Sequence, residues 1–191
     1  MEERKYKLTD ETKGVFGVTL HRIVAIKDFA NVKPGDKGGW VEKEDNLSHY
    51  GNAWVYDDAW VYGNARVYDD ASVYGNARVY GKVWVYGNAR VYGNARVYGN
   101  AQVYGDAWVY GDAEVCNRAD YIVFKNFWSS GRYFTWTRSN NKWKVGCFYG
   151  TGEELIAKAY KDSEKSGREY ERVVRYVESI LADEEKDKQN K

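Results

Sequence analysis

Residues that build disulfide and metal frameworks are scarce in this chain, which has two cysteines, two histidines and one proline among 191 residues. Cys116 and Cys147 are too few for a disulfide framework, and neither has a histidine or a second cysteine at metal-ligand spacing. We therefore predict two reduced thiols and no metal centre.

Long apolar runs are also missing. None approaches the roughly 20 residues of a membrane span, and the charged residues 1–13 lack the apolar region of a signal peptide. The formal net charge is +1, so no overall field favours nucleic acid or an anionic membrane. These absences predict a cytoplasmic protein without a membrane partner.

What the chain does have is a six-residue repeat over residues 51–119, with the consensus V-Y-G-N-A-R. A six-residue period does not fit an amphipathic helix, and Val and Tyr favour extended chain while Gly-Asn pairs favour corners. Val and Ala stand two residues apart, on one face of a strand, and only stacked repeats can bury that face. The valines are Val55, Val61, Val67, Val73, Val79, Val85, Val91, Val97, Val103, Val109 and Val115.

These hexads resemble those of the left-handed parallel β-helix superfamily, in which an aliphatic and a small residue recur at these positions. In that family three hexads close a triangular coil, which implies nearly four coils over residues 51–119. Tyr departs from the pattern, because the family prefers a small or acidic residue after the aliphatic one. The left-handed sense follows from the resemblance alone.

The rest of the chain is expected to close the two ends of the solenoid, giving a mainly β protein. Residues 1–50 are predicted to form an N-terminal β cap, with strands near 6–9 and 16–26, and a first partial coil. This coil is expected to begin at residues 38–41, because Val41 and Leu47 stand six residues apart. A two-residue insertion precedes Val55. A solenoid end needs such a cap because its strand edges are otherwise unpaired.

After Ala119 the hexads stop. Alternating residues predict an antiparallel sheet over 120–150, with strands at 120–127, 133–138 and 142–148. Two helices are expected within 151–182, near 152–164 and 167–182, each starting at a capping box: Thr151 with Glu154, and Ser166 with Glu169. Residues 183–191 are charged and predicted to be disordered.

Residues 121–150 combine ten aromatic and five basic side chains with no acidic one. Such a set can stack a planar ring and pair with an anion. The alternative is that the rings cover the end of the solenoid and the charges keep that cap soluble. The candidate binding residues are Lys125, Trp128, Arg132, Trp136, Arg138, Lys142, Trp143 and Lys144.

Aromatic and arginine residues also precede the repeat valines, so that each face is expected to carry outward ladders. Such residues dominate interface energetics, and related β-helices commonly form trimers side by side, which predicts a homotrimer. The alternative is a solvated surface stabilised by stacking. The interface candidates are Trp54, Trp60, Trp84 and Trp108.

Two further blocks, GGWVEKEDNLSHYGNAWVY and WKVGCFYGTGEEL, resemble small hexapeptide-repeat proteins of bacteriophages and gut bacteria. Those proteins have no assigned function and are commonly labelled acyltransferases from the repeat alone. The resemblance implies a mobile-element origin, and then the cytoplasm of a host cell, but it brings no mechanism.

The leading hypothesis is therefore a non-enzymatic binding protein that presents its solenoid and aromatic-basic sheet to a host protein or an anionic, nucleotide-like ligand. If the phage resemblance holds, inhibition of a host defence system is one specialisation. A fibre or assembly module ranks last, because both ends are expected to be capped.

The alternative is a coenzyme A-dependent acyltransferase, as many β-helix relatives are. Such enzymes use a histidine as general base. Only His21 and His49 exist here, and His49 is the weak catalytic candidate because it is the one near a coil. Residues 51–119 offer no extruded loop to cover a pantetheine arm, so a structural role for His49 is the simpler interpretation.

Overall fold

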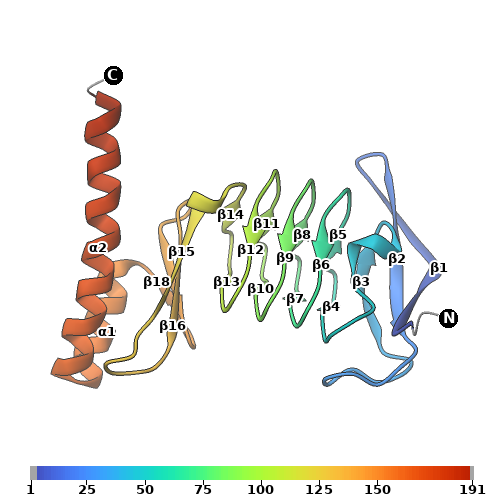
Figure 1. Ribbon diagram of the computed structural model, residues 1–191, viewed down its shortest axis with the longest axis horizontal. Helices are drawn as coiled ribbons and strands as arrows, with labels where there is room; N and C mark the ends of the chain where they lie inside the picture. The colour runs from blue at the N-terminus through green and yellow to red at the C-terminus, as the bar shows by residue number, and fades with distance from the viewer. Residues whose placement is uncertain (1–3, 190–191) are drawn as a thin grey trace. The chain divides into compact units, whose positions relative to one another are not determined.

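The structure is a computed structural model that describes residues 4–189, and the chain forms two compact units within it. The first unit contains the chain up to Tyr121 together with Thr137–Asn140, and the second contains Ile122–Trp136 and the chain from Asn141 onward. Figure 1 shows the coils of the first unit stacked along one axis, with the N-terminal hairpin at one end of the stack.

A β-solenoid of about four turns makes up most of the first unit and confirms the predicted fold class. Parallel register pairs Trp54 with Ser72, Ser72 with Arg90, and Arg90 with Trp108, so one coil takes three hexads. Each hexad contributes a short strand and a corner. The strands are β4 (Trp54–Val55), β5 (Trp60–Val61), β6 (Arg66–Val67), β7 (Ser72–Val73), β8 (Arg78–Val79), β9 (Trp84–Val85), β10 (Arg90–Val91), β11 (Arg96–Val97), β12 (Gln102–Val103), β13 (Trp108–Val109) and β14 (Glu114–Val115).

The core of the solenoid consists of the two predicted aliphatic columns. Every repeat valine from Val55 to Val115 is at most 1% exposed, and the alanines between them are fully buried. Backbone amides hold the coils together by donating to carbonyls of the next coil, as from Trp54 to Ala71 and from Arg96 to Ala113. All three sheets of the prism are built this way.

Corners between the strands require a positive φ, which explains the glycine after most repeat tyrosines. Gly63 has φ 70°, and Asp57 and Asp69 occupy the equivalent corners with φ 51° and 58°. Their carboxylates accept hydrogen bonds from the amides of Gly75 (3.1 Å) and Gly87 (3.2 Å) in the next coil. These bonds offset the strain that a non-glycine residue has in this conformation.

An antiparallel hairpin of β1 (Tyr6–Val15) and β2 (Val18–Ala25) caps the start of the solenoid. The first strand extends beyond the predicted 6–9, because the chain reverses only at Phe16 and Gly17. β3 (Lys37–Val41) continues the sheet and pairs Val41 with Val61, and Leu47 pairs with Val67. Both separations exceed three hexads by two positions, which confirms the predicted insertion before Val55.

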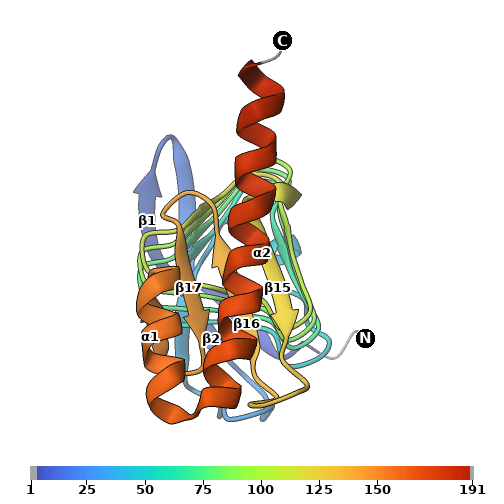
Figure 2. The same ribbon diagram turned by 90° about the vertical axis from the view of Figure 1, so that its left-hand side faces the viewer.

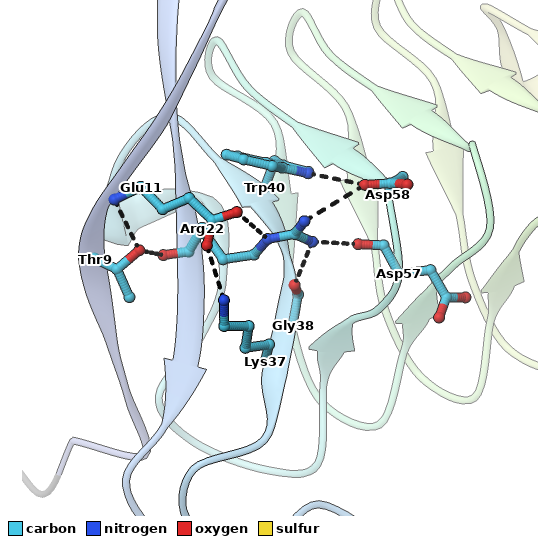
Figure 3. A network of polar contacts seen from close by, with 8 residues as sticks. All are labelled: Thr9, Glu11, Arg22, Lys37, Gly38, Trp40, Asp57 and Asp58. Carbon is cyan, nitrogen blue, oxygen red and sulfur yellow. Dashed lines mark hydrogen bonds and ion pairs between the residues drawn. The ribbon is translucent and has the colours of Figure 1, made fainter.

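Arg22 of β2 ties the hairpin to the first corner of the solenoid (Figure 3). Its guanidinium stacks on the Trp40 ring and donates to the carbonyls of Gly38 (3.0 Å) and Asp57 (2.7 Å). The Asp58 carboxylate accepts from the Trp40 indole at 3.3 Å. A short 3-10 helix, Glu44–Asn46, then leads into the first coil.

The second unit is an antiparallel sheet packed against two helices, and Figure 2 shows α1 and α2 in front of the sheet. Four strands form the sheet, whereas the sequence predicted three, because a turn at Gly146 and Cys147 folds the chain back so that Val145 pairs with Phe148. The strands are β15 (Tyr121–Lys125), β16 (Tyr133–Thr137), β17 (Lys142–Val145) and β18 (Phe148–Gly150). A 3-10 helix, Arg118–Asp120, precedes β15.

The two helices are α1 (Gly152–Asp162) and α2 (Glu164–Gln189). The capping box of Thr151 and Glu154 is confirmed, but the predicted box at Ser166 is wrong: Ser166 donates its amide to the hydroxyl of Ser163, which starts α2 earlier in the chain. α2 also runs through residues 183–189, which were expected to be disordered. Glu, Lys and Gln are good helix formers and extend a helix that is already nucleated. Residues 190–191 lie outside the described part of the chain.

Candidate functional site

Two of the predicted binding tryptophans are core residues and not ligand contacts. Trp136 on β16 and Trp143 on β17 are 1% and 2% exposed and pack with Leu155 and Val174 of the helices. The Trp136 indole donates to the Asn141 side chain at 2.8 Å. These rings form the hydrophobic core of the second unit, so the prediction that they bind a ligand is corrected.

The predicted basic residues do not form one patch. Lys142 and Lys144 lie on the face of β17 opposite Trp143, and both are half-buried; burial lowers the pKa of Lys144. Arg132 is exposed in the loop before β16. Arg138 belongs to the first unit, where its Nε donates to the carbonyl of Ala119 at 3.2 Å. The structure thus divides the predicted set between the two units.

The remaining candidates, Lys125 and Trp128, belong to an exposed aromatic cluster. Phe127 is 71% exposed and Trp128 66% exposed, in the loop between β15 and β16. The Lys125 ammonium lies 5.1 Å from the centre of the Phe127 ring and 4.9 Å from that of Tyr133. The ammonium therefore makes cation–π contacts with two rings of this cluster.

Asn126 fixes the loop that carries these rings. It is 3% exposed, and its side-chain oxygen accepts from the amides of Trp128 and Ser129, both at 3.0 Å. Its amide nitrogen donates to the Ser129 hydroxyl at 3.0 Å. A buried side chain therefore sets the backbone of a loop whose two largest rings remain in solvent.

Next to this loop, β15 and α2 enclose a cavity of about 470 Å³, which we call the aromatic groove. Sequence reasoning missed its helical wall. Tyr176 is 55% exposed and lies off the buried stripe of α2 formed by Tyr170, Val174 and Val177, which is the signal that could have singled it out. The groove is lined by Phe124, Lys125, Asn126, Trp128, Glu169, Arg172, Val173 and Tyr176.

His49 lies beside a second cavity, of about 530 Å³, at the start of the solenoid. Its ring stacks on Tyr6 with 4.3 Å between ring centres, and its Nδ1 accepts from the backbone amide of Lys5 at 3.4 Å. The Nε2 atom is buried as well, so neither ring nitrogen is placed for a general base and the geometry suits a structural histidine.

The four interface tryptophans differ in exposure although they occupy equivalent repeat positions. Trp54 is 1% exposed beneath Tyr6 and Phe29, so it is not available to a partner, and the prediction for it is corrected. Arg78 stacks on Trp60 and Arg90 on Trp108. Trp84 is 44% exposed.

No helix among residues 4–189 is both long and apolar enough to cross a membrane.

The repeats match those of known proteins. The family model of the YdcK β-solenoid repeat matches residues 59–74, 71–87, 84–99, 89–105 and 101–117. A protein of Escherichia coli (strain K12) named uncharacterized acetyltransferase YdcK is 39% identical over 62 residues, covering 28% of this chain. The chain spans 19% of that relative's length. With coils of three hexads and two buried aliphatic columns, the repeat segment is a β-solenoid that fits the hexapeptide-repeat β-helix family.

Proposed function

We propose that this β-solenoid protein is a non-enzymatic binding protein, and that its aromatic groove takes up an exposed segment of a protein partner. The observation that carries the proposal is the pair of exposed rings, Phe127 and Trp128, on a loop held by the buried side chain of Asn126. Large rings cost free energy when they stay in water. A loop built to keep them there is typical of an interaction site.

The composition of the groove supports a protein partner. Tryptophan, tyrosine and arginine dominate binding energy at protein interfaces, and Trp128, Tyr176 and Arg172 meet here. Because Asn126 fixes the loop, little conformational entropy is lost on binding. The groove can therefore act as a preformed pocket for an apolar side chain.

Charge indicates which segment would fit. Lys125 and Arg172 line the groove with one carboxylate, Glu169, which accepts from Arg172 at 2.7 Å. The exposed Arg132 adds a positive charge to the same loop. The matching partner segment is an apolar residue flanked by acidic ones.

Mass spectrometry of proteins that copurify from cells tests this proposal. Trp128→Ala and Tyr176→Ala should each reduce recovery of the partner at least about tenfold, the usual effect of an interface hot spot. Phe16→Ala is the matched control, since Phe16 is 81% exposed at the tip of the N-terminal hairpin, outside the groove. Equal recovery with wild type and Trp128→Ala would contradict the proposal, and a thermal shift with nucleotides that Trp128→Ala abolishes would favour the nucleotide-like ligand instead.

The second candidate function, a coenzyme A-dependent acyltransferase, is supported by the name of the Escherichia coli relative, of whose length the match covers 19%. The burial of His49 Nε2 and the contact of Nδ1 with the Lys5 amide argue against it. A thermal shift with acetyl-coenzyme A and an acetylation rate lost in His49→Ala would revive this function. The homotrimer, the mobile-element origin and the host-defence role stay predictions from the resemblance, and light scattering would test the trimer.

A further inference from the structure

One face of the solenoid carries an arginine and a tryptophan that lack the side-chain contacts made by the arginines and tryptophans at the same repeat position on the other faces. This face is the sheet of β6, β9 and β12, in which Arg66 pairs in register with Trp84, and Trp84 with Gln102. We call the outer surface of this sheet the third face. It belongs to the first unit and does not include the aromatic groove.

The other ladder arginines all have a partner. Arg78 stacks on Trp60 at 4.4 Å, Arg90 stacks on Trp108 at 4.9 Å, and Arg96 forms an ion pair with Glu114 at 3.2 Å. Arg66 is exposed, and its guanidinium makes no hydrogen bond, ion pair or ring stack with any residue from 4 to 189.

The same contrast holds for the tryptophans. Trp54 is covered by Tyr6 and Phe29, whereas Trp60 and Trp108 are each stacked by an arginine. Trp84 is 44% exposed, and no ring or cation of the described chain covers it. A bare ring therefore lies beside a bare guanidinium on adjacent strands.

A cavity of about 540 Å³ opens over this pair. Besides Arg66 and Trp84, its wall includes the cations Lys43 and Lys82 and the carboxylate of Asp45, which give this cavity a net charge of +2. Asn64 and Asn100 face it from two different coils. The cavity near His49 shares Asp45, Arg66 and Trp84 with this one and adds the carboxylate of Glu44, so the two hollows together form a trough with a net charge of +1.

The chemistry of this trough defines a ligand. A bare indole face packs against the flat C–H face of a sugar ring, and side-chain amides both donate to and accept from hydroxyl groups. A guanidinium with two lysines pairs with a carboxylate. The base of a nucleotide could stack on the indole, and its phosphate could pair with the cations. Its hydrogen-bonding groups lie only along the edge of the base, however, so it matches amides on two separate coils less well than a chain of sugar hydroxyls does. We propose that the third face binds an acidic saccharide, a chain of sugar rings that carry carboxylates.

Calorimetric titration with a trimer of galacturonic acid tests this inference, with uncharged maltotriose and AMP as comparison ligands. We expect the acid sugar to bind, to bind more weakly as salt is raised, and to lose at least about tenfold in affinity in Arg66→Ala and in Trp84→Ala. Arg96→Ala is the matched control, because Arg96 occupies the same repeat position in another sheet. This variant should bind the acid sugar with the affinity of wild type.

Three outcomes would overturn the inference. They are no binding of the acid trisaccharide at millimolar concentration, equal binding of maltotriose, and tighter binding of AMP that the same two variants abolish. Light scattering provides a fourth. If wild type is an oligomer that Trp84→Ala converts to monomer, the third face is a subunit interface and not a saccharide site. Circular dichroism should show both variants folded, since both residues are exposed and neither belongs to the core.

Discussion

The ammonium group of Lys5 donates a hydrogen bond of 2.7 Å to the carbonyl of Ala53. It donates a second one, of 3.2 Å, to the carbonyl of Gly51. Both carbonyls belong to the first full coil, and no amide of an earlier coil among residues 4–189 donates to them. A lysine that is 2% exposed therefore closes the carbonyl edge at the start of the solenoid.

Replacing Lys5 with methionine should destabilise the first unit by about 1–3 kcal/mol, because the buried carbonyl of Ala53 and the part-buried carbonyl of Gly51 lose their donor while the packing volume is kept. Chemical denaturation followed by circular dichroism measures this change. Lys7→Met is the control, since Lys7 is exposed on β1 only two residues after Lys5, and it should change the free energy of unfolding by less than about 0.5 kcal/mol. Equal effects of the two substitutions would show that the carbonyl contacts of Lys5 contribute nothing.

Stability should also depend on pH through Lys5. Burial lowers the pKa of its amine from 10.5 to about 8, and the carboxylate of Asp70 acts in the opposite direction. Between these two values the unfolded chain binds a proton that the folded chain has released, so the free energy of unfolding rises with pH in this window. Burial also raises the pKa of the Tyr6 hydroxyl, so the unfolded chain loses this proton first and the free energy of unfolding falls above pH ~10. Measurements on Lys5 should therefore stop near pH ~9.5.

Melting temperatures of wild type and Lys5→Met, measured from pH 7 to about 9.5, isolate this contribution. Wild type should gain relative to the variant as pH rises above 8. A constant difference across the range would mean that Lys5 titrates at its usual pKa.

The tyrosine ladders should contribute to stability in proportion to the stacks that are broken. Tyr86 lies between Tyr68 and Tyr104, with ring centres 5.0 and 5.4 Å apart and nearly parallel planes. Each aromatic pair contributes about 0.5–1.5 kcal/mol beyond its buried area. Tyr86→Ala should therefore cost about twice as much as Tyr104→Ala, which breaks one stack at the end of the ladder. Equal losses in urea denaturation would show that stacking adds nothing to burial.

Gly167 allows α1 and α2 to approach each other, because a methyl group there would overlap the ring of Tyr160. Alanine normally stabilises a helix by about 1 kcal/mol relative to glycine. We expect Gly167→Ala to destabilise the wild-type chain and to stabilise the Tyr160→Ala variant by about that amount. A double-mutant cycle of thermal unfolding measures this, and the same sign in both backgrounds would rule out the overlap.

The sequence predicted a residue's environment correctly where the repeat itself supplies the neighbours, and it failed where the neighbours come from segments distant in sequence. The hexad fixes the buried position of every Val and Ala, because each stacks on its own equivalent in the next coil. It does not distinguish Trp54 from Trp84. The repeat gives both the same environment, and only the N-terminal hairpin and the segment after it, distant in sequence, cover the first.

The same limit applied to the C-terminal sheet. Alternation along β17 places Trp143 and Lys144 on opposite faces, but it does not say which face the helices cover. Rings and cations alternate along this strand. The aromatic residues that suggested a binding site therefore lie in the core, whereas the basic ones lie on the opposite face. The groove that remains required the position of Tyr176 on α2, which only the packed helices define.

Because the amides that join the coils donate toward the later coil, the solenoid is a directional rod with two unlike ends. Donors from Lys5, Arg22 and Asn46 satisfy carbonyls at the acceptor end. The hydroxyl of Ser139 and the carboxylate of Asp120 receive amides of Glu114 and Cys116 at the donor end. The two terminal segments are therefore not interchangeable, whereas inserting or deleting a whole coil of three hexads in the middle leaves both ends unchanged.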